Sequence, residues 1–126
     1  MALPDAVMRA ALREVAACCD RRVPEDAQVT VEVRARGDAL TVFERTPPWP
    51  AGGGEEWVES KVAQLRRDKR ARTWELFAYD WRGRRVAYPL LAPGRDLEPL
   101  LDELESDPIC MFWRSLPVKA AQRASS

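Results

Sequence analysis

The chain contains no histidine among its 126 residues. Histidine is the usual general base near neutral pH and the commonest metal ligand, so its absence excludes Ser-His and Cys-His catalytic pairs. Cys18, Cys19 and Cys110 have no CxxC spacing, and no histidine is available to complete a zinc set. We therefore assign no catalytic residue, no metal and no cofactor, and we expect the cysteines to be reduced, buried, small apolar side chains.

The sequence also lacks a long apolar run and a net charge. No stretch approaches the roughly 20 residues that cross a bilayer, and Asp5 and Arg9 interrupt the N-terminal stretch before a signal-peptide core is complete. The 20 lysines and arginines cancel the 20 acidic residues, so no global field attracts nucleic acid or an anionic membrane. We expect a cytoplasmic protein that does not bind membranes.

Length and composition fit one globular domain. Hydrophobic residues at 46% and charged residues at 32% are ordinary for a chain that folds around its own core. A chain of 126 residues buries roughly two thirds of its unfolded surface without a disulfide or a metal. From Pro117 onward the residues are small or polar, so we expect a domain over residues 1–116 and a disordered tail over residues 117–126.

Hydrophobic periodicity predicts two helices. In the first, Asp5 stands at the N-cap and apolar residues follow along one face: Met8, Leu12, Val15, Ala16 and Cys19. In the second, Asp96 stands at the N-cap, and Pro108 ends a helix whose apolar face consists of Leu97, Leu100, Leu101 and Leu104. Residues 109–113 are then expected to return to the core.

Period-two alternation predicts the strands. Residues 29–35 alternate between apolar and polar, Gly37-Asp38 makes a turn, and residues 40–45 complete a hairpin. A meander follows, with alternation that is weak over residues 57–67, strongest over residues 73–81 and short over residues 84–88.

These elements define an α+β fold. We predict a single domain with a curved antiparallel sheet of about five strands, a hairpin plus a three-strand meander, flanked by an N-terminal and a C-terminal helix. The helices need an apolar bed on the sheet, which we assign to Val31, Val33, Val42, Leu65, Trp74, Leu76 and Val86.

Tryptophan is abundant, with five residues. Trp49 lies among the prolines and glycines of residues 46–54, and we predict that it is buried and fixes this loop against the sheet. Two interpretations stay open for Trp49, Trp57, Trp81 and Trp113: they anchor the core and the loops, as large aromatic residues usually do, or they stack on bases or another ligand. In strand 73–81 both faces are apolar, so the side with Phe77, Tyr79 and Trp81 is either covered or displays an aromatic surface.

Charge is uneven along the chain although it sums to zero. Residues 61–85 hold nine basic and three acidic side chains, whereas residues 96–107 hold six acidic and no basic ones. Three interpretations stay open. The basic residues protect strand edges from aggregation. Alternatively, the basic meander 61–85 meets the acidic helix 96–107 of another molecule, giving a homodimer or a protein complex.

The third interpretation is a single nucleic-acid strand bound to the meander, with phosphates on the basic residues and bases stacked on Tyr79 and Trp81. The candidate surface for a partner or for nucleic acid consists of Arg70, Arg72, Trp81, Arg82, Arg84 and Arg85.

One enzyme motif is present. Glu59-Ser60-Lys61 matches the acid-x-Lys element of metal-dependent nucleases, in which the acid holds Mg²⁺ and the lysine steadies the attacking water. The element needs a second acid on a neighbouring strand, and Glu44 is the candidate. With 20 acidic residues in the chain the triplet arises readily by chance. Glu55 and Glu56 with Glu59 form a weaker candidate site for a divalent cation.

Four segments carry a family resemblance. They are Phe43-Glu44-Arg45-Thr46-Pro47-Pro48-Trp49, Trp57 with the strand after it, Thr73-Trp74-Glu75-Leu76 with Tyr79 and Trp81, and Asp107-Pro108 followed by Phe112-Trp113. With these four segments together, residues 21–113 resemble a family of small bacterial proteins catalogued as domain of unknown function 3024. One position departs from the family: Thr46 stands where an Arg or another polar residue is expected before the prolines. The family implies no activity, cofactor or partner.

The residues together favour a non-enzymatic binding or protein-interaction module of unknown partner. The alternative is a small nucleic-acid-binding protein that uses the basic, aromatic-bearing meander. A metal-dependent nuclease ranks third, because the missing histidine disfavours enzymes and the triplet is weak.

Overall fold

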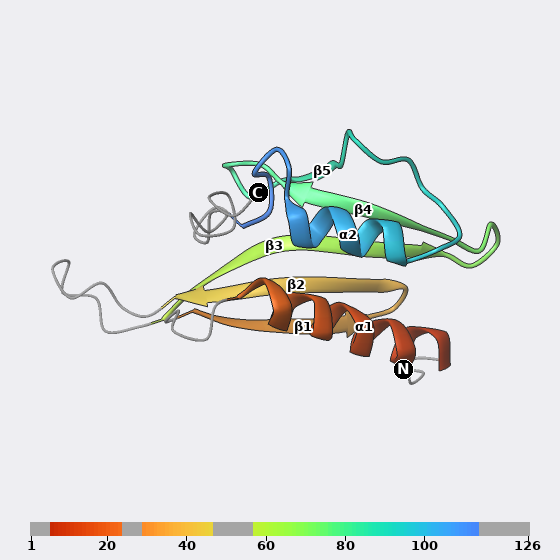
Figure 1. Ribbon diagram of the computed structural model, residues 1–126, viewed down its shortest axis with the longest axis horizontal. Helices are drawn as coiled ribbons and strands as arrows, with labels where there is room; N and C mark the ends of the chain where they lie inside the picture. The colour runs from red at the N-terminus through yellow and green to blue at the C-terminus, as the bar shows by residue number, and fades with distance from the viewer. Residues whose placement is uncertain (1–5, 24–28, 47–56, 114–126) are drawn as a thin grey trace, which may run out of the picture.

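The computed structural model describes residues 6–23, 29–46 and 57–113. Figure 1 shows the elements in chain order: α1 (Ala6–Arg22), β1 (Thr30–Arg36), β2 (Ala39–Thr46), β3 (Val58–Asp68), β4 (Thr73–Tyr79), β5 (Arg85–Ala87) and α2 (Glu98–Ser106). The order and the type of every element agree with the sequence prediction, and the α+β class is confirmed. Neither helix in these ranges is long and apolar enough to cross a lipid bilayer.

The five strands form one antiparallel sheet in the order β1-β2-β3-β4-β5. Each strand therefore pairs with the next one in sequence, and the predicted hairpin and meander join where β2 pairs with β3. A two-residue turn connects β1 to β2. Gly37 has a φ of 58° in this turn, a left-handed conformation that glycine adopts at little cost.

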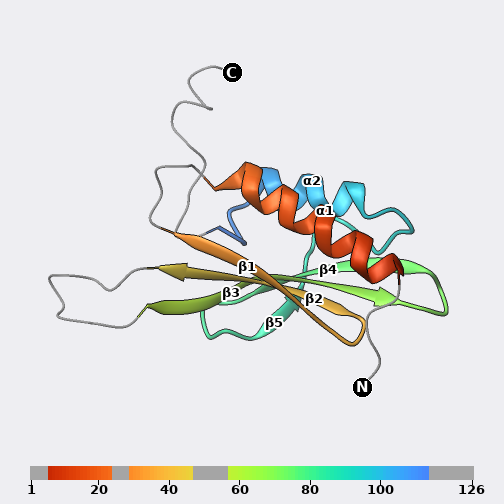
Figure 2. The same cartoon turned by 90° about the horizontal axis from the view of Figure 1, so that it is seen from below.

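Both helices cover the same face of the sheet, as Figure 2 shows. Helix α1 lies against β1, and α2 lies against β4 and beside α1. Among the residues that the structure describes, no helix covers the opposite face, which we call the open face. Alternate residues of each strand therefore build the core or point to solvent.

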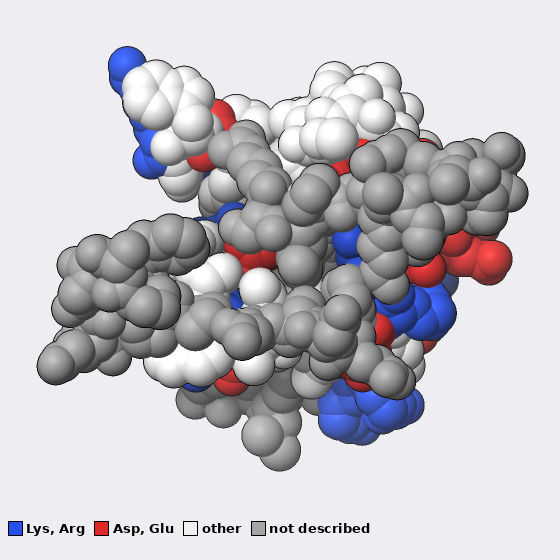
Figure 3. Space-filling model, turned by 60° about the vertical axis from the view of Figure 1, so that its left-hand side comes forward, with Lys and Arg blue, Asp and Glu red and all other residues white. Residues whose placement is uncertain are grey.

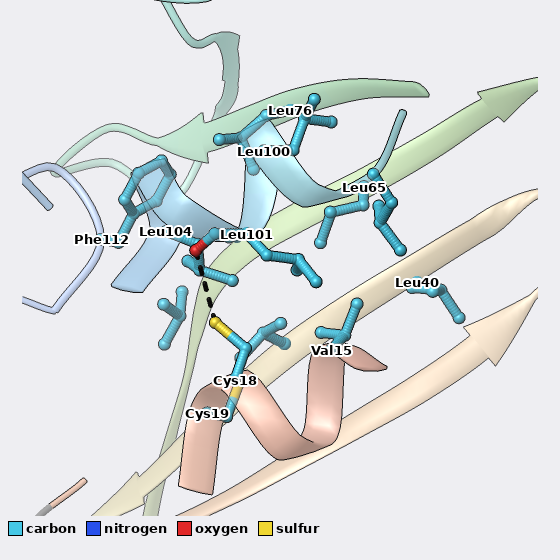
Figure 4. Close-up of a cluster of buried hydrophobic side chains, with 14 of the residues drawn as sticks. Val15, Cys18, Cys19, Leu40, Leu65, Leu76, Leu100, Leu101, Leu104 and Phe112 are labelled. Atoms are coloured by element: carbon cyan, nitrogen blue, oxygen red, sulfur yellow. Dashed lines mark hydrogen bonds between the residues drawn. The ribbon is translucent and has the colours of Figure 1, made fainter. Parts of the chain in front are cut away.

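The core fills the space between the helices and the sheet. Its fully buried side chains come from both layers and include Val15, Leu40, Leu65, Leu76, Leu100 and Leu104 (Figure 4). All seven residues predicted as the apolar bed belong to this core or pack against it. Burial of each leucine stabilises the fold by about 1.5–3 kcal/mol.

The buried face of α1 is rotated from the predicted one. Ala11 and Cys18 are buried with Met8, Val15 and Cys19, whereas the predicted Leu12 and Ala16 are half-buried. Contact with both the sheet and α2 decides which side of the helix is covered. The Cys18 thiol donates a hydrogen bond of 3.4 Å to the Leu101 carbonyl of α2, drawn as the dashed line in Figure 4.

A β-bulge explains why the alternation in β3 is weak. Val42 pairs with Ala63 but Phe43 pairs with Lys61, so Val62 is an extra residue in β3. A bulge shifts the alternation of side chains by one position, and Val62 and Ala63 are both buried. A period-two pattern is lost at such a point.

Helix α2 begins later than predicted. Leu97 is the N-cap residue and no side chain caps the helix, so the prediction that Asp96 is the cap is wrong. The buried Leu97 fixes the start instead, since its carbonyl accepts the N–H groups of Leu100 and Leu101 at 3.0 and 3.1 Å. Asp107 follows the helix in a left-handed conformation, with a φ of 47°.

The return of the chain to the core after α2 is confirmed in part. Phe112 and Trp113 are buried, as predicted for residues 109–113, whereas Ile109 is exposed. The Trp113 indole N–H donates a hydrogen bond of 2.7 Å to the Leu104 carbonyl. This contact fixes the segment against the C-terminal turn of α2.

Several predictions concern residues outside the described ranges. They are the Asp5 cap, the burial of Trp49 in its loop, the cation site at Glu55 and Glu56, and the tail over residues 117–126. The domain boundary at residue 116 stays a prediction for the same reason.

Candidate binding surface on the open face

The six residues predicted as a binding surface lie in two groups. Arg70 and Arg72 are in the turn between β3 and β4, whereas Trp81, Arg82 and Arg84 are in the turn between β4 and β5, and Arg85 is in β5. The two turns lie at opposite ends of β4, which spans roughly 20 Å at about 3.3 Å per residue. The structure thus brings four of the six residues together and separates them from Arg70 and Arg72.

The open face carries more basic than acidic side chains. Strand alternation and register place these basic residues on it: Arg34, Arg36, Arg45, Lys61, Arg66 and Arg85. The acidic residues on the same face are Glu32, Glu59, Asp68 and Glu75, and the aromatic ones are Phe43, Phe77 and Tyr79. Arginines of the first hairpin thus add to those of the predicted meander.

Each aromatic ring of this face has a cation beside it. The distances from the cation to the ring centroid are 4.0 Å for Arg34 and Phe43, 4.7 Å for Arg85 and Phe77, and 5.5 Å for Lys61 and Tyr79. A cation over an exposed ring contributes about 0.5–1 kcal/mol. The open face therefore presents cations that lie over aromatic rings, rather than uncovered rings.

Arg34 is the most constrained cation of the open face. Its Nη2 atom lies 2.6 Å from Glu32 Oε1 and 2.6 Å from Glu59 Oε1, and its Nη1 atom donates to Glu59 Oε2 at 3.2 Å. The hydrogen bonds to Glu59 and Glu32 raise the pKa of Arg34 above its usual range, and the same contact lowers the pKa of Glu59. Arg34 is therefore fixed in place as a permanent positive charge.

A hydrogen-bonded chain links three strands across the same face. Arg85 Nη1 donates to Gln64 Oε1 at 2.8 Å, and Gln64 Nε2 donates to Thr41 Oγ1 at 2.9 Å. The amide of Gln64 thereby holds the Arg85 guanidinium over the Phe77 ring of β4. A guanidinium held in this way can serve as a stacking surface.

A hollow of about 480 Å³ lies on this face. Every ionisable residue that lines it is a cation: Arg34, Arg36, Lys61 and Arg66. Thr41, Phe43 and Gln64 complete the polar and aromatic lining with Ala39. Glu32 and Glu59 bind Arg34 from outside this lining. The lining still attracts anions, because Arg36, Lys61 and Arg66 add three further positive charges.

The turn between β4 and β5 is ordered by Asp80. Its Oδ1 atom accepts the N–H groups of Arg82 and Arg84 at 2.9 and 2.8 Å. Backbone hydrogen bonding from Arg84, above all, lowers the pKa of Asp80. Trp81 projects from this turn with 78% of its surface exposed, and the Arg82 guanidinium lies 4.6 Å from its ring centroid. Trp57 is exposed as well, whereas Trp74 and Trp113 are buried.

The structure does not assemble the nuclease element. Glu44 pairs with Ser60 and Glu59 pairs with Arg45, so Glu44 and Glu59 point to opposite faces of the sheet. Both oxygens of Glu59 already bind Arg34. Within residues 6–23, 29–46 and 57–113, no group of three acidic or cysteine side chains is placed to hold a metal ion.

Glu44 lines a second hollow, of about 490 Å³, at the end of the sheet where β3 and β4 diverge. We call it the end hollow. The register of these two strands starts only at Gln64 and Phe77, so the first half of β3 runs free of β4. Figure 3 views this end of the molecule and shows the hollow, with acidic and basic atoms both reaching its surface.

The acidic helix is partly neutralised within the molecule. The Tyr88 hydroxyl donates to Glu103 Oε1 at 2.7 Å, and Arg21 of α1 lies 3.2 Å from Glu105 Oε1. Asp107 accepts backbone N–H groups. Glu98 and Asp102 are exposed carboxylates of α2 without such a contact among the described residues.

The cysteines confirm the prediction at two of three positions. Cys18 and Cys19 are buried, and burial raises the pKa of Cys18 to about 11 and the pKa of Cys19 further. Cys110 is exposed, so the prediction that it is buried is wrong. It lies in the loop after α2, where the chain turns outward between Asp107 and Phe112.

A family model matches residues 3–114, a range that contains every residue that the structure describes. The chain belongs to the family called domain of unknown function 3024. Neither the curated proteins nor the solved structures contain a match. The resemblance seen in the sequence is thereby confirmed.

The fold explains the role of several residues in the segments that resemble domain of unknown function 3024. Asp107 ends α2 and binds the backbone of Phe112 and Trp113, which accounts for the Asp-Pro and Phe-Trp pairs. Trp74 is buried in the core. Glu44 stands buried in the end hollow.

Sequence reasoning missed the contribution of the first hairpin to the open face. Arg34 and Arg36 lie outside the basic segment 61–85 in sequence but border Lys61 and Arg66 in the hollow. The signal was present in the alternation of residues 29–35, which points Arg34 away from the core. Only the strand order places β1 within reach of β3 across β2.

Proposed function

We propose that the protein is a non-enzymatic binding module whose open face binds single-stranded nucleic acid. The observation that carries the proposal is the hollow of about 480 Å³ whose ionisable lining is wholly cationic. Phosphate groups are the anions that such a lining fits best, because arginine binds phosphate oxygens through two parallel N–H groups.

The stacked pairs supply the second half of the recognition. The guanidinium planes of Arg34 and Arg85 lie over Phe43 and Phe77, and bases stack on arginine planes as well as on aromatic rings. Stacking of this kind tolerates any base, so we expect little sequence preference. Phosphates are held at the hollow while neighbouring bases lie along the sheet.

Double-stranded DNA fits this face less well. The open face of a five-stranded sheet presents neither a helix nor a two-stranded ribbon for the major groove. The planes available for stacking also require bases that are already unpaired.

Self-association is the competing proposal, through the acidic helix 96–107 and the basic segment 61–85. It is weakened because Glu103 and Glu105 already bind Tyr88 and Arg21 within the molecule.

We also place the protein in the cytoplasm, because the thiols of Cys18, Cys19 and Cys110 are free, as is usual in a reducing compartment.

The test is an anisotropy titration of a short labelled single-stranded oligonucleotide at low salt. Arg36→Glu with Arg66→Glu reverses two cations of the hollow that make no structural ion pair in the described chain. We expect affinity to fall roughly tenfold or more, a loss of at least about 1.4 kcal/mol. The matched control, Arg70→Glu with Arg95→Glu, makes the same change in net charge away from the hollow.

The control is expected to bind nearly as well as the unmodified protein. Equal losses in both double variants would show non-specific charge attraction and contradict the proposal. Absence of binding by the unmodified protein at low salt would contradict it as well. A duplex of the same length serves as competitor and should displace the single strand poorly.

A further inference from the structure

A buried carboxyl group at the end of the sheet lacks a partner. The Glu44 side chain is 3% exposed, and its Oε2 atom accepts no hydrogen bond. Burial of an oxygen that accepts no hydrogen bond costs free energy. Since Glu44 lines the end hollow, a ligand that enters this hollow can supply the missing donor.

The other acidic residues of the end hollow are already bound. Glu59 gives both oxygens to Arg34. Asp80 accepts two backbone N–H groups through Oδ1, and its Oδ2 atom accepts Arg84 Nε at 3.2 Å. Glu44 is therefore the acidic group of this lining with an uncommitted oxygen.

Arg22 is a buried cation whose charge acts on Glu44. The fields of Asp107 and Glu44 are among those that raise the pKa of Arg22, although burial outweighs them and lowers it. The Arg22 guanidinium itself lies over the Trp113 ring, 5.7 Å from the centroid. Arg22 thus lowers the cost of burying Glu44 but leaves its Oε2 atom without a donor.

Aromatic walls surround the same space. Tyr79, Trp81 and Phe112 line the end hollow with Glu44, and ring faces attract cations. The protein's own cations already use two of these rings, Lys61 at Tyr79 and Arg82 at Trp81. Lys61 lines both hollows and so marks the boundary between the two.

A divalent metal ion does not fit this site. Calcium takes six to eight oxygen ligands and magnesium demands a near-ideal octahedron, whereas no three acidic or cysteine side chains of the described residues are placed to hold a metal ion. An organic cation needs only one carboxylate for its N–H groups and an apolar wall for its stem.

We propose that the end hollow binds an ammonium or guanidinium group on an apolar stem, which donates a hydrogen bond to Glu44 Oε2. The group belongs either to a small amine or to a lysine or arginine side chain of a partner protein. This site shares Lys61 with the cationic hollow of the open face, but binding there does not require nucleic acid on the open face.

The experiment uses the full chain and two cationic probes, n-butylammonium and n-butylguanidinium, with n-butanol as the neutral probe. Backbone amide shifts are followed by NMR during titration. We expect saturable shifts at Ser60, Lys61 and Phe112 with both cations and none with butanol. Absence of saturable shifts around the hollow in the unmodified protein would overturn the proposal whatever the variants do.

Glu44→Gln keeps the shape of the side chain and removes its charge. A charge-assisted hydrogen bond is worth about 1.5–3 kcal/mol, so the dissociation constant of both cations should rise about tenfold or more. The melting temperature should stay level or rise, because Glu44 then serves binding at a cost in stability. The control variant Glu98→Gln changes an exposed carboxylate at the far end of α2 and should leave both quantities unchanged.

Unchanged affinity in Glu44→Gln, or an affinity loss equally large in Glu98→Gln, would contradict the proposal. A capped pentapeptide with a central arginine distinguishes the two sources of the cation. Tighter binding of the peptide than of n-butylguanidinium supports a protein partner, and weaker binding supports a small amine.

Discussion

The carboxylate of Asp107 binds the backbone of Trp113 six residues ahead, with 2.9 Å between Asp107 Oδ2 and the Trp113 nitrogen. Its Oδ1 atom accepts the N–H groups of Met111 and Phe112 at 2.8 and 3.2 Å. A buried side chain at the end of α2 thereby holds a loop that closes both the core and the end hollow.

Removal of this carboxylate should weaken the whole domain. Asp107→Ala leaves three backbone N–H groups without acceptors, each costing about 1–3 kcal/mol when buried, so we expect the free energy of unfolding to fall by about 3 kcal/mol. Urea denaturation measures it. Asp102→Ala, at an exposed position of the same helix, is the control and should change stability by less than about 0.5 kcal/mol. Equal effects would contradict the role given to Asp107.

Two tryptophans at the two ends of β4 should respond oppositely to truncation. Trp81 is exposed and Trp74 is 5% exposed. Trp74→Ala should cost about 3–5 kcal/mol, whereas Trp81→Ala should stay within about 0.5 kcal/mol, again by urea denaturation. A large loss of stability in Trp81→Ala would mean that the turn packs against the domain in solution.

Most of the fold follows from local patterns in the sequence. The five-strand order was predictable because most strands alternate and neighbours are joined in sequence. The end of β4 was predicted two residues too late: the strand stops at Tyr79, and Trp81 lies in the turn that Asp80 orders. The bulge at Val62 was not predictable, because an extra residue erases the period-two alternation that reveals a strand. The exposure of Ile109 and Cys110 was not predictable either, since it depends on the hydrogen bonds of Asp107.

Tyr88 makes the free energy of unfolding depend on pH in the alkaline range. Burial raises the pKa of Tyr88 most, and its hydrogen bond to Glu103 raises it further. The folded pKa lies above the unfolded value of about 10, so the contribution of Tyr88 is fully present below about pH 10. It is lost as the pH rises through the folded pKa.

We therefore expect the unmodified protein to be more stable than Tyr88→Phe at neutral pH, with a difference that shrinks above about pH 10. Because the other titrating groups are common to both proteins, their contributions cancel in the comparison. Urea denaturation across this range measures the difference. A constant difference would show that the hydroxyl titrates alike in the folded and unfolded states.

Thiol labelling should distinguish the three cysteines. The raised pKa values of Cys18 and Cys19 follow from burial first, and a buried thiol is both protonated and inaccessible. We expect a thiol reagent to modify Cys110 rapidly in the native protein and the other two only after unfolding. Rapid modification of a second cysteine, mapped by mass spectrometry, would contradict the packing of α1 against α2.

The candidate surface was predictable only in part. The basic excess of residues 61–85 led to Arg85, Trp81 and the turn residues, but strand direction separates Arg70 and Arg72 from them. The wholly cationic hollow joins side chains from three strands, and no spacing in the sequence reveals such a set. Glu44 was noted as a partner acid for Glu59, yet its burial without a hydrogen-bond donor at Oε2 is visible only in three dimensions.

The salt dependence of oligonucleotide binding tests the central claim most directly. Each phosphate contact contributes about −0.7 to the slope of log K against log salt for a single strand. Arg34 is already bound to Glu32 and Glu59, so the other three cations of the hollow predict a slope of about −2.1. Arg36→Gln with Arg66→Gln should reduce the slope to about −0.7. A slope that the double variant leaves unchanged, or no binding at low salt, would contradict the assignment of the open face as the binding surface.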